Sequence, residues 1–163
     1  MREHRLKILV IGLGEVGRDV ARTLETAGHR VTGVDPQKSA FEKFHDVDIA
    51  FVTGNGASPR VLRSAGVRRC DLVIACTDND EVNLIAALIS KRLGAKTTIA
   101  RLHTSTYEDL DTEEDEEGGL HYGMLGIDFV VNPSVLVTEE MISIARSHGA
   151  LDVHFFAEHQ IEL

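Results

Sequence analysis

The sequence predicts an α/β fold built on a doubly wound parallel sheet. An apolar run from Ile8 leads directly into the motif Gly12-x-Gly14-x-x-Gly17, and Asp35 follows eighteen residues later at the end of a second apolar run. This order of strand, glycine loop, helix, strand and acid is typical of a Rossmann-like dinucleotide-binding unit. Further along the chain, short β-branched runs alternate with helix-period segments, as parallel strands joined by helical crossovers require.

Six strands are expected, each a short run of apolar and β-branched residues bounded by turn residues. They cover residues 7–11, 31–34, 49–52, 72–75, 97–101 and 129–131. A seventh strand-like run, at residues 153–157, follows a helix that Pro133 opens. The prediction is therefore a Rossmann-like doubly wound parallel sheet with a C-terminal crossover helix and a short final strand.

Four helical segments are expected between the strands. The first ends at Gly28 and places four apolar residues on one face: Val16, Val20, Leu24 and Ala27. Another ends at Gly94 and has a broader apolar face, formed by Leu84, Ile85, Leu88, Ile89 and Leu93. Shorter helical pieces fit residues 41–44 and 59–65.

Length and composition favour one globular domain. With 163 residues and 43% apolar content, the chain can bury a sizeable core, but it is too short for a two-domain dehydrogenase. No apolar stretch approaches the roughly 20 residues that span a bilayer, and the first residues lack an apolar signal core. We therefore expect a cytoplasmic protein. Its two cysteines, Cys70 and Cys76, match no metal or disulfide pattern.

The formal net charge of −9 comes from one segment. Residues 108–117 contain eight acidic residues and no Lys or Arg, while the remaining 18 acidic residues nearly balance the 17 basic ones. We expect this segment to be a solvated loop, with cation binding or partner docking as the alternative. Nothing in the sequence resembles a basic stripe, so a nucleic-acid partner is not expected.

The glycine motif predicts a site for a pyrophosphate. Gly12 permits the tight turn off the strand, Gly14 lets the backbone approach the phosphates, and Gly17 allows close packing of helix and strand. The phosphates then lie at a helix N-terminus, where unpaired N–H groups attract anions. Asp35 accepts hydrogen bonds from the adenosine ribose and repels a 2′-phosphate, which favours NAD(H) or an adenine nucleotide over NADP.

Ligands of such a sheet lie at the carboxyl ends of the strands, so the other turns there are candidate sites. After the third strand, Thr53, Gly54 and Asn55 begin a run of small residues, continued by Gly56, Ala57 and Ser58, that lets the backbone approach an adenine or ribose. An ordinary turn followed by a helix cap explains these residues equally well.

Two further strand ends carry polar residues. Thr77 and Asp78 follow the fourth strand and begin the turn 77–81, whose amides and side chains are placed to contact the second half of a dinucleotide. Helix capping alone would also explain Asp78 or Asp80. Arg101 ends the fifth strand, where its guanidinium pairs either with a phosphate or with a surface carboxylate.

No catalytic or metal-binding set is expected. The eight histidines show no metal spacing, and neither Tyr107 nor Tyr122 is followed four residues later by the lysine of short-chain dehydrogenases. The sequence also lacks a P-loop and a Gly-x-Ser-x-Gly nucleophile elbow.

The last helix predicts self-association. Apolar residues between Pro133 and about Arg146 occupy more than one helix face, whereas a helix that covers only its own sheet needs one stripe. An exposed stripe of that size implies a partner chain. We therefore divide the chain into a nucleotide-binding unit, residues 1–132, and a homodimerisation element, residues 133–163.

Several segments are distinctive when taken together: I-G-L-G-E-V-G, V-D-P, T-G-N-G-A-S, V-L-R-S-A-G-V, C-D-L-V-I-A-C-T-D-N-D-E-V-N and I-A-R-L. They resemble the N-terminal nucleotide-binding domain of Trk/Ktr potassium-uptake regulatory subunits, also called the RCK or TrkA-N domain. The resemblance runs from Lys7 to about Ala157. Its specific part lies between Ala65 and Asn83, because the glycine motif alone does not separate this family from dehydrogenases.

The resemblance implies a sensor and not an enzyme: a cytoplasmic subunit, peripheral on the inner face of the cell membrane, that gates a potassium transporter or channel. Such subunits form dimers within rings, bind NAD(H) or ATP/ADP, and commonly carry a second regulatory domain that this sequence lacks. An acid at Glu15, where some ATP-responsive relatives have a basic residue, repels a γ-phosphate and favours NAD(H). The family's ligand positions correspond to Gly12, Leu13, Gly14, Glu15, Val16, Asp35, Thr77, Asp78 and Arg101.

Two alternative functions stay open from the sequence. One is a fragment of an NAD-dependent oxidoreductase, which would need a substrate pocket and a positioned acid or base after the nucleotide fold. The chain ends too soon to supply these. The other is a nucleotide sensor of a different ion transporter, such as an antiporter or a chloride channel, because the docking surface of a transporter is not a readable motif.

Overall fold

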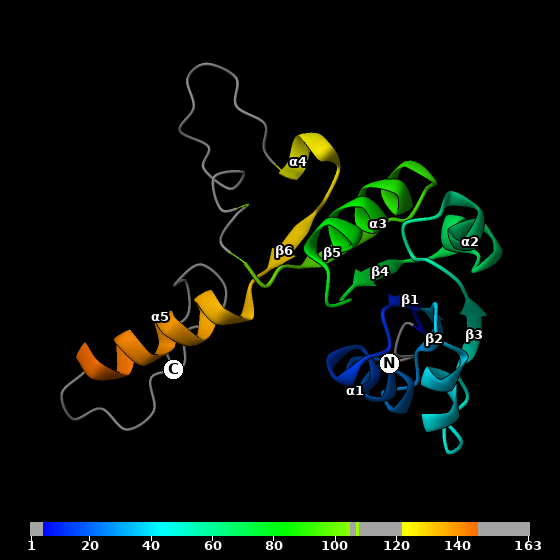
Figure 1. The fold of residues 1–163 in the computed structure, drawn as a ribbon, viewed down its shortest axis with the longest axis horizontal. Coiled ribbons are helices and arrows are strands. Elements are labelled where there is room, and N and C mark those ends of the chain that lie inside the picture. Colours follow the sequence, from blue (N-terminus) through cyan, green and yellow to red (C-terminus); the bar gives the residue numbers. More distant parts are fainter. Residues whose placement is uncertain (1–4, 105–106, 108–121, 147–163) are drawn as a thin grey trace. The chain divides into compact units, whose positions relative to one another are not determined.

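The computed structural model describes residues 5–104, 107 and 122–146, and the chain divides into two compact units, Met1–Val131 and Asn132–Leu163. Strands and helices alternate in the first unit (Figure 1). Their order is β1 (Lys7–Ile11), α1 (Glu15–Thr26), β2 (Arg30–Asp35), the 3-10 helix η1 (Lys38–Lys43), β3 (Ala50–Thr53), α2 (Pro59–Ser64), the 3-10 helix η2 (Val67–Arg69), β4 (Leu72–Ala75), α3 (Asp80–Arg92), β5 (Thr97–Arg101), α4 (Tyr122–Leu125) and β6 (Phe129–Val131). The described part of the second unit contains α5 (Pro133–Arg146). Within the described ranges, no helix is both long and apolar enough to cross a bilayer.

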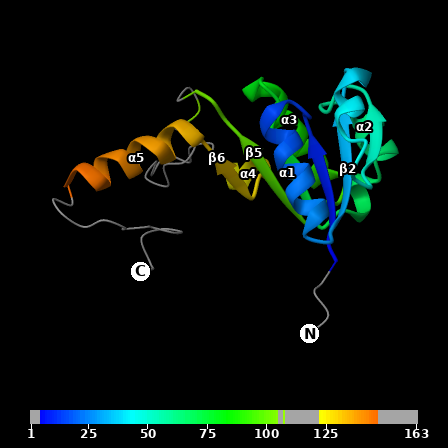
Figure 2. The ribbon, with the colours of Figure 1, turned by 90° about the horizontal axis from the view of Figure 1, so that it is seen from below.

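The six strands form one parallel sheet in the order β3-β2-β1-β4-β5-β6. This confirms the predicted α/β fold with a doubly wound parallel sheet. In β1, Ile11 lies opposite Val34 of β2 on one side and opposite Ala75 of β4 on the other. Figure 2 shows β5 and β6 towards one edge and β2 towards the other. The winding reverses between β1 and β4, so a crevice that can bind ligands opens at their carboxyl ends.

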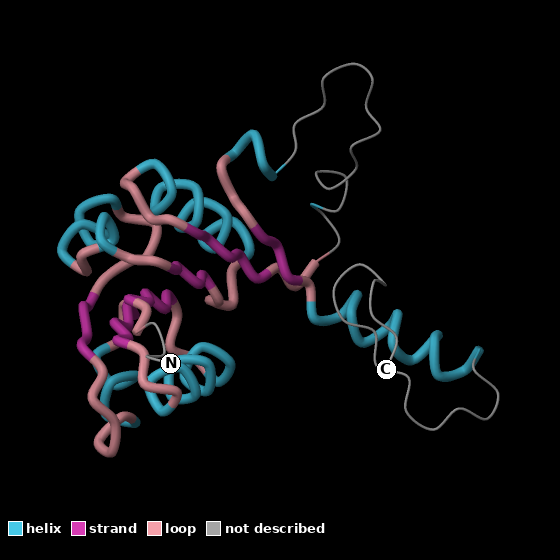
Figure 3. The backbone as a smooth tube through the Cα atoms, turned by 180° about the vertical axis from the view of Figure 1, so that it is seen from behind, coloured by secondary structure: helices cyan, strands magenta, loops and turns pink. Residues whose placement is uncertain are grey.

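Helices cover both faces of the sheet (Figures 1 and 3). On one face, Ile8 and Val10 of β1 pack with Ala21 of α1 and with the segment around η1. On the other face, Leu9 and Ile11 pack with residues of α2 and α3. Because side chains alternate between two buried faces, β1 is apolar throughout its central residues.

Two helices bury only part of the face that apolar periodicity predicts. In α1, Val20 and Leu24 pack against the core as expected, but Val16 and the C-cap residue Ala27 are exposed, and the fully buried residues are Gly17 and Ala21. In α3, Ile85 is 47% exposed and the buried residues are small or polar: Asp80, Asn83, Ala86, Ala87 and Ser90. Small side chains let the helix lie close to the sheet, and the predicted Leu84, Ile89 and Leu93 pack at the margins of this contact.

Most strand predictions match the observed bounds, but β2 extends one residue further at each end and β3 begins and ends one residue later. α4 and η2 have no counterpart in the sequence prediction, because segments of three or four residues are too short to display a period. The strand expected at residues 153–157 and the acidic segment at 108–117 lie outside the described residues.

Candidate functional site

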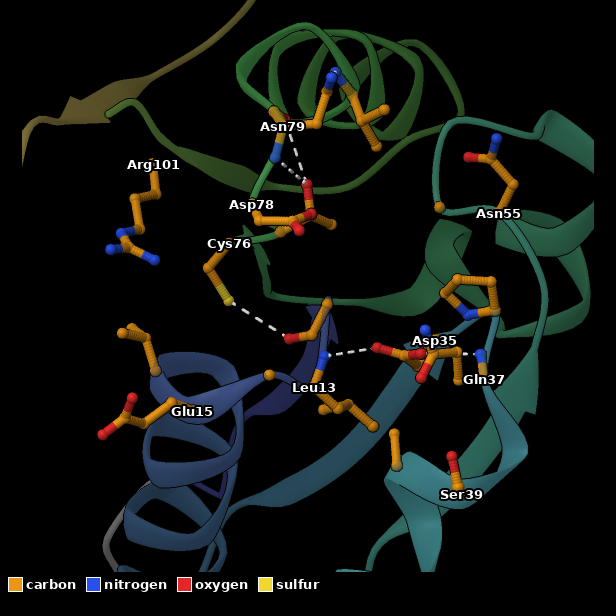
Figure 4. A pocket seen from close by; sticks show the side chains of 18 of the residues that line it. Leu13, Glu15, Asp35, Gln37, Ser39, Asn55, Cys76, Asp78, Asn79 and Arg101 are labelled. Carbon is orange, nitrogen blue, oxygen red and sulfur yellow. Dashed lines mark hydrogen bonds between the residues drawn. The ribbon is translucent and has the colours of Figure 1, made fainter. Parts of the chain in front are cut away.

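A pocket of about 600 Å³ lies at the carboxyl ends of the strands of the first unit (Figure 4). Volumes of this size are typical of cofactor sites. Figure 4 shows Glu15 and Arg101 on one side of the pocket, with Asp35, Gln37 and Ser39 on the other. The lining residues are Gly12, Leu13, Gly14, Glu15, Val16, Asp35, Pro36, Gln37, Ser39, Ala40, Lys43, Asn55, Gly56, Cys76, Thr77, Asp78, Asn79, Val82 and Arg101.

The glycine loop forms the floor of the pocket. Gly12 has a φ of +86°, and a Cβ atom there would lie 2.8 Å from the backbone of Thr77. A Cβ atom on Gly17 would lie 1.8 Å from the carbonyl oxygen of Gly12, whereas one on Gly14 would meet nothing within 4 Å. Gly14 also precedes α1 without offering a side-chain cap, so the first N–H groups of the helix are left for a ligand.

Asp35 ties the glycine loop to the end of β2. Its Oδ2 accepts a hydrogen bond from the backbone N–H of Leu13 (2.9 Å), and its Oδ1 accepts one from the N–H of Gln37 (2.8 Å). Each carboxylate oxygen keeps a further lone pair for a ligand donor. The carboxylate is therefore fixed before any ligand arrives.

The loop after β4 forms the opposite wall. Asn79, not Asp78 or Asp80, caps α3, because its side chain accepts a hydrogen bond from Val82 N–H (2.7 Å). The capping explanation that the sequence allowed for Asp78 therefore fails, and Asp78 is an exposed residue of the pocket lining.

Asp80 binds the chain that leaves β5. Its buried carboxylate accepts hydrogen bonds from the backbone N–H groups of His103 (2.9 Å) and Thr104 (3.0 Å), and it also contacts His103 Nδ1 (2.7 Å) and Thr104 Oγ1 (2.9 Å). Burial raises the pKa of Asp80, but the hydrogen bonds from His103 and Thr104 outweigh it and hold the pKa below its ordinary value. Asp80 is thus a structural anion beside the pocket.

Arg101 ends β5 and faces the pocket. Its Nε atom is buried and has no hydrogen-bond partner among the described residues, and no carboxylate in the described ranges forms an ion pair with it. Of the two explanations that the sequence allows, a surface salt bridge is therefore not observed in that part of the chain. A buried guanidinium N–H without an acceptor is unfavourable, so this site calls for an anion.

Cys76 lies beneath the glycine loop. Its thiol donates to the carbonyl oxygens of Ile11 (3.5 Å) and Gly12 (3.6 Å), and burial raises its pKa to about 11. The thiol is consequently neutral at physiological pH and a weak nucleophile.

Among the described residues, no group of three or more His, Cys, Asp or Glu side chains is placed to hold a metal ion.

The family model of the TrkA-N domain matches residues 8–133. The chain belongs to this family. It is 33% identical over 158 residues to the Trk system potassium uptake protein TrkA homolog of Archaeoglobus fulgidus, covering 97% of this chain and 34% of that protein. It is 34% identical over 163 residues to the Trk system potassium uptake protein TrkA of Haemophilus influenzae, with the same coverage. The chain thus spans about a third of the length of these relatives.

A solved structure of the GsuK channel bound to NAD has the same fold. The TM-score is 0.66 at 19% sequence identity, and the match covers 86% of this chain and 24% of that one. The TrkA-N sheet of this chain therefore has a counterpart in an ion channel whose structure contains NAD.

The TrkA-N pocket gathers the residues singled out in the sequence, apart from three. Gly17, Thr53 and Gly54 do not line it. Gly17 packs against Gly12, and Thr53 pairs with Asp35 in the sheet. Gly54 N–H donates to the carbonyl oxygen of Asp35 (3.0 Å). These three residues therefore support the pocket without lining it.

Sequence reasoning missed several residues that line the pocket. Those around η1 come directly after Asp35, so the signal that could have found them was their position beyond a strand end. Cys76 directly precedes Thr77, and Val82 follows in the first turn of α3. The full set is Gln37, Ser39, Ala40, Lys43, Cys76 and Val82.

Proposed function

We propose that the chain is the nucleotide-binding domain of a regulatory subunit that gates a potassium transporter or channel from the cytoplasmic face of the membrane. The observation that carries the proposal is the convergence of two anion-seeking groups on one pocket. The uncapped N-terminus of α1 is one, and the guanidinium of Arg101, whose Nε lacks a partner among the described residues, is the other. The potassium uptake proteins to which the chain is similar support the transport role.

NAD(H) is the ligand we favour, with ATP or ADP as the alternative. Glu15 is the first residue of α1 and lines the pocket beside the glycine loop. Its carboxylate would face the additional charge of a triphosphate, and like charges in proximity are unfavourable. Structures of the GsuK channel contain NAD in one case and ADP in another, so they support a nucleotide in this pocket without separating the two ligands.

We expect the purified chain to bind NAD and NADH in titration calorimetry, more tightly than ATP. Arg101→Leu should weaken NAD binding by about tenfold or more, since a hydrogen bond to a charged group contributes about 1.5–3 kcal/mol. Arg92→Leu is the matched control, because Arg92 is exposed on α3 and lies outside the pocket. Equal affinities of the two variants would contradict a phosphate at Arg101.

The regulatory role also implies that the nucleotide leaves unchanged. The absorbance of NADH at the nicotinamide band should stay constant when candidate substrates are added to the pure protein. Sustained oxidation of NADH would favour an oxidoreductase instead.

We further propose that residues 133–163 form a homodimerisation element, within a dimer or a larger ring. Several apolar side chains of α5 are exposed in the described structure: Leu136 (56%), Val137 (49%), Met141 (65%) and Ile142 (44%). They lie on more than one side of the helix. Apolar surface of this kind on a soluble helix marks an association site.

Met141→Glu should therefore weaken the dimer by at least about tenfold, because association would bury an unpaired carboxylate. Sedimentation velocity across a concentration series measures the change. Ser143→Glu adds the same charge next to Glu139 and Glu140, on the side of α5 opposite Met141, and should leave the dimer intact. A monomeric unmodified chain at micromolar concentration would contradict the assignment.

A further inference from the structure

Asn83 is a buried polar residue of α3 that does not itself line the nucleotide pocket. Its Oδ1 accepts hydrogen bonds from Thr77 N–H (2.8 Å) and from Thr77 Oγ1 (2.7 Å). Its Nδ2 donates to the carbonyl oxygens of Thr77 (3.1 Å) and Arg101 (2.8 Å). One side chain therefore holds the loop after β4 and the last residue of β5 at the same time.

The position of these bonds is informative. The ladder between β4 and β5 ends at the pair Ala75 and Ala100, so the sheet itself does not join the two chain segments that follow. Thr77 and Arg101 lie beyond that last pair and both line the pocket. Asn83 replaces the missing ladder with side-chain hydrogen bonds, and both amide hydrogens and the amide oxygen are used.

We propose that Asn83 is a positioning residue for the half of the pocket opposite Asp35. It sets the distance between the Thr77 loop and the end of β5, and so the place where Arg101 meets the ligand. The inference rests on the proposed nucleotide binding, in which Asp35 holds the adenosine ribose and the Thr77 and Arg101 side holds the remainder of NAD.

The two halves of the pocket should respond differently to the loss of Asn83. Asp35 is fixed by Leu13 and Gln37, whereas Asn83 is hydrogen-bonded to Thr77 and Arg101. AMP, which consists of adenosine and one phosphate, occupies that half and the glycine loop. NAD also needs the other half. A general loss of stability would instead weaken both ligands alike.

The test compares calorimetric affinities for NAD and AMP in two variants. Asn83→Leu keeps the branched shape of the side chain and removes all four hydrogen bonds. Asn83→Asp keeps the two that Oδ1 accepts but places a second carboxylate oxygen against the carbonyl oxygens of Thr77 and Arg101. Thr98→Val is the matched control. Thr98 is a fully buried polar residue of β5, bound to Asp128 at the other end of the strand, so its loss destabilises the fold away from the pocket.

We expect Asn83→Leu to lower the affinity for NAD by about tenfold or more, while the affinity for AMP changes by less than about twofold. Asn83→Asp should also weaken NAD binding more than AMP binding, because its carboxylate oxygen repels the carbonyl oxygen of Arg101. Thr98→Val should lower the melting temperature with both affinities unchanged. Equal losses for NAD and AMP, or no loss for either, would overturn the positioning role.

A second measurement uses the unmodified chain and does not depend on how the variants fold. Binding of NAD should slow hydrogen exchange of the Thr77 amide, which Asn83 holds, and AMP should not. Identical protection by the two ligands would also overturn the inference. If the unmodified chain binds neither ligand, the proposed nucleotide binding is wrong. If the chain binds NAD and the Asn83 variants bind it equally well, only the positioning role is wrong.

Discussion

Gly17→Ala is expected to abolish measurable nucleotide binding and to destabilise the fold. The added methyl group would lie 1.8 Å from the carbonyl oxygen of Gly12, and it would also approach the thiol of Cys76 within 3.0 Å. A carbonyl oxygen of the backbone cannot move aside as a flexible side chain can, so α1 must shift away from β1. Strain of this kind in a buried position lowers the free energy of unfolding by roughly 2–4 kcal/mol.

Gly14→Ala provides the matched control in the same loop. Gly14 has a φ of −62°, which any residue adopts, and a Cβ atom there meets no protein atom within 4 Å. The melting temperature should therefore stay close to that of the unmodified chain. Because the methyl group enters the space next to the phosphates, NAD should still bind more weakly. If Gly17→Ala melts like Gly14→Ala, the close packing of α1 on β1 is not what Gly17 provides.

NAD is expected to bind at least about 100-fold more tightly than NADP, since a like-charge contact between Asp35 and the 2′-phosphate costs several kcal/mol. The carboxylate cannot turn away, because Leu13 N–H and Gln37 N–H each hold one of its oxygens. Competition calorimetry with the two cofactors measures the ratio. Equal affinities for NAD and NADP would show that Asp35 serves only as a turn residue.

Asp35→Ala should weaken NAD binding and narrow the difference in affinity between NAD and NADP. The variant also frees the N–H of Leu13, so the glycine loop loses an anchor and part of the loss will extend to every nucleotide. Asp35→Asn separates the two effects. Its amide oxygen can still accept one of the two backbone hydrogen bonds while the charge is gone, so the gap should narrow with a smaller loss for NAD.

The sequence by itself determined the features that depend on local spacing. The glycine loop and Asp35 could be placed on two neighbouring strands because the strand, loop, helix and acid follow one another within one βαβ unit. The strands could also be predicted from the sequence, since each is a continuous apolar run between turn residues. The same logic placed Thr77, Asp78 and Arg101 at the ends of their strands, and these residues do line one pocket.

Only the tertiary structure decided which contacts form between distant segments. The periodicity of α3 indicated its large apolar residues as the buried face, and Ile89 and Leu93 do pack against the core. The fully buried positions, however, include Asn83 and two alanines, because a small-residue face lets the helix approach the sheet. The burial of Arg101 Nε without a partner among the described residues, and the hydrogen bonds of Asn83 to Thr77 and Arg101, involve residues up to 18 positions apart. Such bonds depend on how closely neighbouring strands and helices pack, and a one-dimensional pattern does not contain that distance.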